Sequence, residues 1–113
     1  MILIYVVCKN KAEAKKIGFA LVKKRLTGCC NIFPIETIYR LSDEIIEDRP
    51  RKNSSRIIRG KEVVLLIKTL KKNFKKIEKE VKKMHSYTAP CIIEIPTGKV
   101  NSEYLKWLNK EAK

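Results

Sequence analysis

Several features that mark common protein classes are scarce in this sequence. Only four glycines and one histidine occur in 113 residues, so the chain has neither a glycine-rich loop that cradles phosphate nor a Cys-His array with zinc-finger spacing. The four cysteines form no CxxC pair and lie in or beside apolar runs. These absences argue against a structural zinc site and against a disulfide scaffold.

Long hydrophobic runs are also absent. The first eight residues, MILIYVVC, form a short apolar run with no preceding positive charge and no small-residue cleavage site. Such a run is typical of a buried strand and argues against a signal peptide or a membrane span. Together with the cysteine pattern, it predicts a protein of the reducing cytoplasm that does not contact a membrane.

Acidic residues are few, with 12 Asp and Glu against 26 Lys and Arg, which gives a formal charge of +14. Hydrophobic residues make up 44% of the chain and recur at regular spacing among the charges, a pattern that argues against disorder and predicts one folded domain over residues 1–113. The charge favours non-specific polyanion binding, to nucleic acid for example, but it identifies no biological partner.

Apolar periodicity predicts four strands and three helices. Runs of β-branched residues favour strands, and apolar residues spaced three or four apart among lysines favour helices. The strands are expected at 2–8, 29–46, 62–69 and 91–95, and the helices at 12–26, at 70–84 and from Asn101 or Ser102 onward. Pro34 should bend the second strand, and the polar segment 48–61 should lie in the connection of a hairpin.

The order of these elements is β-α-β-β-α-β followed by a terminal helix. Two βαβ crossovers around one hairpin predict an α+β fold of the ferredoxin-like type. In this arrangement the helices cover one face of the sheet and leave the other face in need of a partner, a ligand or water. We therefore expect function to reside on the uncovered face.

Five segments carry a resemblance to a known family: RLTGCCNIFP at 25–34, IYRLSDEIIED at 38–48, EVVLLIKT at 62–69, HSYTAPCIIEIP at 85–96 and YLKWL at 104–108. In this order they resemble the CutA family of divalent-cation-tolerance proteins. The resemblance implies a homotrimer with long hairpin strands joining sheets across subunits, and a capacity to bind copper or other divalent metal ions. It implies no required cofactor, and the trimer's likeness to nitrogen-regulatory proteins suggests signalling.

The sequence departs from the family pattern at three positions and in one segment. Ser86 stands where the family usually has Pro, Leu41 replaces a common Trp, and Cys91 replaces a Glu that is proposed to help bind metal. Residues 49–61 resemble an insertion at the hairpin tip and contain six basic residues and no acidic one. We expect this tip to be mobile and to carry most of any polyanion affinity.

Three residues are predicted as metal ligands, each with a structural alternative. His85 offers an imidazole, although a histidine at a helix C-terminus also serves as a cation that interacts with the last carbonyls. Cys8 and Cys91 offer sulfur, although free cysteines in strands are mostly small buried hydrophobes. A set with two thiolates favours copper(I) and zinc.

The family match also predicts a cleft between subunits lined by Tyr39, Lys68 and Tyr87, whose phenol and ammonium groups suit an anionic ligand. Cys29 and Cys30 are adjacent strand residues that face opposite sides, so we assign both to packing. No Cys-His-carboxylate spacing compels catalysis, and we expect no enzyme.

Two rival functions remain open. One is a trimeric small-ligand sensor that resembles the nitrogen-regulatory proteins. The other is a basic nucleic-acid-binding module, since an RNA-recognition motif shares this topology. Its central strands would have to offer aromatic side chains, and here they offer only Tyr5. Within the terminal helix, Tyr104, Trp107 and Leu108 are assigned to packing near a subunit boundary.

Overall fold

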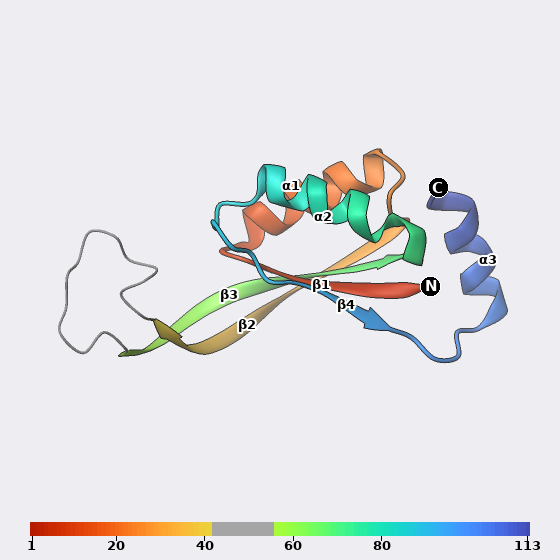
Figure 1. Cartoon of the computed structure of the whole chain (residues 1–113). Coiled ribbons are helices and arrows are strands. Elements are labelled where there is room, and N and C mark those ends of the chain that lie inside the picture. The colour runs from red at the N-terminus through yellow and green to blue at the C-terminus, as the bar shows by residue number, and fades with distance from the viewer. Residues whose placement is uncertain (42–55) are drawn as a thin grey trace.

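The computed structural model describes residues 1–41 and 56–113 (Figure 1). Its elements follow the predicted order and are β1 (Ile2–Cys8), α1 (Lys11–Lys23), β2 (Cys29–Leu41), β3 (Arg56–Thr69), a 3-10 turn (Lys71–Asn73), α2 (Phe74–Met84), β4 (Ile92–Pro96) and α3 (Ser102–Glu111). Among the described residues, no helix combines the length and apolar character that crossing a bilayer requires.

The four strands form one antiparallel sheet in the order β2-β3-β1-β4. Helix α1 connects β1 to β2 across the intervening β3, and α2 connects β3 to β4 across the intervening β1. This is the split βαβ arrangement. Both helices lie on the same face of the sheet (Figure 1), so the predicted ferredoxin-like α+β fold is confirmed.

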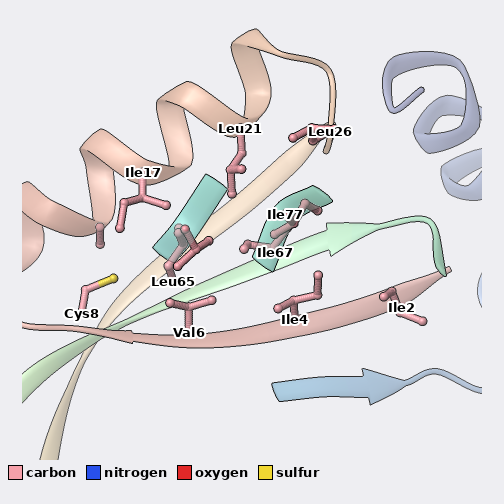
Figure 2. Close-up of a cluster of buried hydrophobic side chains, with 12 residues drawn as sticks. Ile2, Ile4, Val6, Cys8, Ile17, Leu21, Leu26, Leu65, Ile67 and Ile77 are labelled. Atoms are coloured by element: carbon pink, nitrogen blue, oxygen red, sulfur yellow. The ribbon is translucent and has the colours of Figure 1, made fainter. Parts of the chain in front are cut away.

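The core lies between this face and the two helices (Figure 2). Strand alternation directs every second side chain of β1 toward the helices, and these positions are buried while the intervening ones are partly exposed. The buried side chains that meet there are Ile2, Ile4, Val6 and Cys8 of β1, Leu65 and Ile67 of β3, Ile17 and Leu21 of α1, and Ile77 and Val81 of α2. Each large one contributes about 1.5–3 kcal/mol by leaving water.

Helix α1 ends earlier than the predicted residue 26 because the chain turns at Arg25. This residue has a φ of 61°, in the left-handed region that favours glycine. Its side chain secures the turn, since Nε and Nη2 donate to the carbonyls of Glu111 and Lys110 at 3.1 and 2.7 Å. The end of α3 is thereby attached to the end of α1.

Strand β3 is longer than the sequence predicted, whereas the predicted end of the preceding strand, at residue 46, lies outside the described residues. Strand β3 begins at Arg56 rather than at residue 62, and residues 56–62 pair with Ile35–Leu41 of β2. This part of the hairpin has no third strand, because β1 ends opposite Val63. The basic residues and Gly60 in this segment suggested a loop, but a two-stranded ribbon tolerates them because both of its faces meet solvent. The rest of the predicted tip, 49–55, lies outside the described residues.

Candidate functional site

Three groups that can bind a metal ion meet where β1 ends, α1 begins and α2 ends. The Cys8 Sγ, a carboxylate oxygen of Glu13 and a ring nitrogen of His85 all lie within 4.8 Å of one another. Cys8 is the last residue of β1, Glu13 is in the first turn of α1, and His85 follows the last residue of α2. The fold therefore brings together two of the three predicted ligands, Cys8 and His85.

Glu13 is held by backbone N–H groups from two segments. The Asn10 side chain accepts from the Glu13 N–H, and Glu13 Oε1 in turn accepts from the Lys9 N–H, both at 2.9 Å. Glu13 Oε2 accepts from the Ser86 N–H at 2.9 Å. Burial favours the protonated carboxyl, but the hydrogen bonds from Lys9 and Ser86 outweigh it and lower the Glu13 pKa. Glu13 is thus a carboxylate that joins α1 to the segment after α2.

The hydrogen bonds of His85 assign its tautomer. Its side chain is fully buried, Nδ1 accepts from the Tyr87 N–H at 3.0 Å, and Nε2 lies 2.7 Å from the Val7 carbonyl oxygen. Because a carbonyl only accepts, Nε2 carries the proton and the ring is neutral. The imidazole points to β1, so the alternative in which it interacts with the last carbonyls of α2 does not describe this side chain.

Cys8 is fully buried at the edge of the core. Burial raises the pKa of its thiol to about 12, and the negative charges of Glu13 and Glu62 act in the same direction. The thiol is therefore protonated at neutral pH. A metal ion that binds sulfur here must displace that proton, as metal binding to cysteine generally does.

Glu13 was not among the predicted ligands, and Cys91 was predicted as the third ligand beside Cys8 and His85. Within the described part of the chain, the Cys91 thiol is not a member of the group formed by Cys8, Glu13 and His85. Its carbonyl accepts from the Val7 N–H at 3.2 Å, as a neighbour of β1. The signal for Glu13 was present as the spacing Asn10-x-x-Glu13, a capping-box pattern that places a carboxylate at a helix start.

The residues of the predicted cleft occupy two ends of the sheet. The Tyr87 hydroxyl donates to Glu62 at 2.7 Å, and burial followed by this bond raises the Tyr87 pKa. Lys68 lies opposite Cys29 in the paired strands. Cys29 is ten residues, or about 33 Å, along β2 from Tyr39, so Lys68 is about that far from Tyr39. One chain therefore does not bring Lys68 to Tyr39, and a cleft with all three residues needs more than one subunit.

Residues assigned to packing fall into two groups. Cys30 packs against the core and Leu108 is fully buried. Cys29 is opposite Lys68 on the uncovered face, and Trp107 remains 41% exposed. Of these two, only Trp107 was predicted to lie near a subunit boundary.

Comparisons with known proteins agree with this architecture. Residues 2–111 match the family model described as CutA1 divalent ion tolerance protein. A divalent-cation tolerance protein CutA from Thermus thermophilus is 37% identical over 102 residues, which cover 89% of this chain and 87% of that protein. The structure of the periplasmic divalent cation tolerance protein CutA from Archaeoglobus fulgidus superposes with a TM-score of 0.84 at 31% identity, covering 99% of this chain and 98% of that one. CutA1 from Pyrococcus horikoshii gives a TM-score of 0.83 at 29% identity, covering 100% and 99%.

Proposed function

This chain belongs to the CutA1 family of divalent ion tolerance proteins, and on that premise we propose that it binds copper or zinc ions as a homotrimer. The observation that supports metal binding is the convergence of sulfur, imidazole and carboxylate donors within 4.8 Å at Cys8, His85 and Glu13. Sulfur and imidazole ligands bind copper and zinc in preference to magnesium and calcium.

Metal binding at this site competes with the hydrogen bonds already present. If His85 Nε2 binds an ion, it gives up its proton and its bond to the Val7 carbonyl. The proton then belongs on Nδ1, where it opposes the Tyr87 N–H. The His85 proton only changes nitrogen, so the proton released to solvent is that of the Cys8 thiol. We therefore expect metal uptake to release one proton, to weaken as pH falls and to displace the segment 85–87.

Titration calorimetry of the reduced, metal-free protein tests the site, with zinc added directly and copper(I) supplied from a competing chelator. We expect Cys8→Ser and His85→Ala each to weaken binding at least about tenfold, while the matched control Cys29→Ser leaves it unchanged. A Cys91→Ser loss larger than the Glu13→Gln loss would place Cys91 in the ligand set. Unchanged affinity in a Cys8→Ser, His85→Ala, Cys91→Ser triple variant would contradict the proposal.

Titration calorimetry also distinguishes the metal-binding protein from the alternative, a small-ligand sensor. A nucleotide that binds more tightly than copper or zinc, and whose affinity depends on Tyr39 and Tyr87, would favour the small-ligand sensor over the metal-binding protein. We expect no nucleotide binding at comparable concentration. The fold of a single chain does not itself support a sensor, because Lys68 and Tyr39, two residues of the predicted ligand cleft, lie far apart within the chain.

Support for the homotrimer comes from the uncovered face of the sheet. Leu3, Tyr5 and Val7 of β1 lie on this face and are partly exposed, and Ile93 of β4 beside them is 50% exposed. Symmetric closure of three copies would bury these apolar side chains together with strand edges. Sedimentation equilibrium should give three chain masses at micromolar concentration, and a monomer mass in moderate salt would contradict this.

We also propose that the protein resides in the reducing cytoplasm. All four cysteines are free thiols, as expected where glutathione and thioredoxin keep thiols reduced. Alkylation during lysis, followed by mass spectrometry of the denatured chain, should find four modified cysteines. A disulfide in that sample would count against this compartment.

A further inference from the structure

Helix α2 presents a continuous lysine face to solvent. Its apolar stripe, Phe74, Ile77, Val81 and Met84, packs on the sheet. At 100° per residue, the positions opposite Ile77 and Val81 fall on Lys75, Lys79 and Lys83, with Lys76 and Lys82 beside them. All five lysines are exposed, as are Lys71 and Lys72 in the preceding turn.

The two acidic residues of α2 lie at the margins of this face. Glu78 and Glu80 flank the apolar stripe on its two sides, and both are less exposed than the lysines. Glu80 pairs with Lys24 at 2.6 Å and Lys83 at 3.6 Å, and Glu78 pairs with Lys82 at 3.4 Å. Among the described residues, none of the ion pairs involves Lys71, Lys72, Lys75, Lys76 or Lys79. The centre of the face therefore carries positive charge that the chain itself does not compensate.

We infer that this face, centred on Lys75, Lys76 and Lys79, is a binding surface for the phosphate backbone of double-stranded nucleic acid. The inference is independent of the metal proposal. A rigid row of ammonium groups suits a regular line of phosphates, and it confers affinity without reading sequence. Helix α2 spans about 15 Å from Phe74 to Met84, a length along which a duplex presents several phosphates.

Two other polyanionic surfaces fit this face less well. Helices that bind membrane interfaces insert Trp, Phe or Leu beside their lysines, whereas the apolar residues of α2 are turned into the core. Single strands are held by stacking bases on aromatic side chains, and the outward positions of α2 carry none. A duplex backbone needs neither feature.

The test measures how salt weakens binding of the full-length protein to a short DNA duplex, by fluorescence anisotropy. The variant K75Q/K76Q/K79Q should flatten the slope of log K against log salt by about 2.7, because each phosphate contact contributes about 0.9. The matched control K99Q/K106Q/K110Q removes the same charge from exposed positions near and on α3. It should change the slope by less than about 1.

This inference differs from the expectation that the segment 49–61 carries most of any polyanion affinity. A second charge-matched variant, R49Q/R51Q/K52Q, tests that segment against the helix. If the helix variant and the α3 variant flatten the salt slope equally, net charge alone explains the effect and the inference is overturned. A larger flattening of the slope in the R49Q/R51Q/K52Q variant would also overturn it. Tighter binding to phosphatidylserine vesicles or to single-stranded DNA than to the duplex, with the same dependence on Lys75, Lys76 and Lys79, would assign the surface to that partner instead. Unchanged circular dichroism establishes that the variants are folded.

Discussion

The two faces of the sheet are built from the same kinds of side chain but meet different surroundings. On β1, Ile4 is completely buried under the helices, while the neighbouring Leu3 and Tyr5 on the opposite face are partly exposed. On β4, Ile93 pairs with Tyr5 and is 50% exposed. A strand that is apolar at every position is typical of burial on both faces, so the sequence pattern predicts that the uncovered face is also buried, by other copies of the chain as in the proposed trimer.

The largest expected effect is on the covered face. Ile4→Ala should lower the free energy of unfolding by about 2–5 kcal/mol, because it leaves a cavity between β1 and the helices. Chemical denaturation at several protein concentrations measures this loss. The loss should persist at every concentration, since Ile4 contacts its own chain. A loss below 1 kcal/mol would mean that the covered layer is loosely packed.

The uncovered face should respond differently. Ile93→Asp places a charge among Tyr5, Leu3 and their neighbours, which costs little if water is present but several kcal/mol if other copies cover the face. We expect this variant to shift the mass from trimer toward monomer and to make the melting temperature depend on concentration. A stable trimer that tolerates Ile93→Asp would mean that this face is not the interface. Lys99→Asp, in an exposed loop, is the matched control.

The fold was predictable because its elements have strong local signals. The continuous apolar run of β1 and the helical stripe of α2 are visible in the residues themselves, and the element order then leaves few topologies. The start of β3 was not predictable in the same way. Residues 56–61 pair only with β2, so solvent on both faces removes the apolar alternation that identifies a strand.

The site was predictable only in part. Cys8 and His85 came from the family resemblance. Cys8 and Glu13 are near each other in sequence, but their proximity to His85 depends on the end of α2, more than 70 residues later in the chain, folding back to them. The Asn10-x-x-Glu13 pattern predicts a helix cap, but nothing local indicates that the same carboxylate also accepts from Ser86, 73 residues away. The distance between Lys68 and Tyr39 likewise follows from strand register, which emerges only with the folded sheet.

A smaller effect on stability is expected at Glu13, which lies at the edge of the core beneath the helices. Glu13→Gln keeps the shape but removes the charge that accepts from the Lys9 and Ser86 N–H groups. We expect a loss of about 1–3 kcal/mol at neutral pH, measured by denaturation of the metal-free protein. Glu78→Gln is the control, because its exposed pair with Lys82 should contribute no more than about 0.5 kcal/mol. Equal losses would show that Glu13 does not join the two segments.

The smallest effect compares two adjacent residues, Cys30 facing the helices and Cys29 on the uncovered face. Burial raises the Cys30 pKa from 9.0 to about 12. Above pH 9 the unfolded chain loses its thiol proton while the folded chain retains it, so stability contributed below that pH is lost as pH rises toward 12. One such thiol accounts for at most about 1.4 kcal/mol per pH unit, and Cys8, whose pKa is also about 12, adds a similar share. Denaturation between pH 8 and 11 should therefore show a shallower alkaline decline for Cys30→Ala than for the unmodified protein, and Cys29→Ala serves as the matched substitution on the uncovered face. Identical slopes in Cys30→Ala and the unmodified protein would mean that the Cys30 thiol ionises as readily in the folded chain as in the unfolded one, and that the covered face admits water at this position.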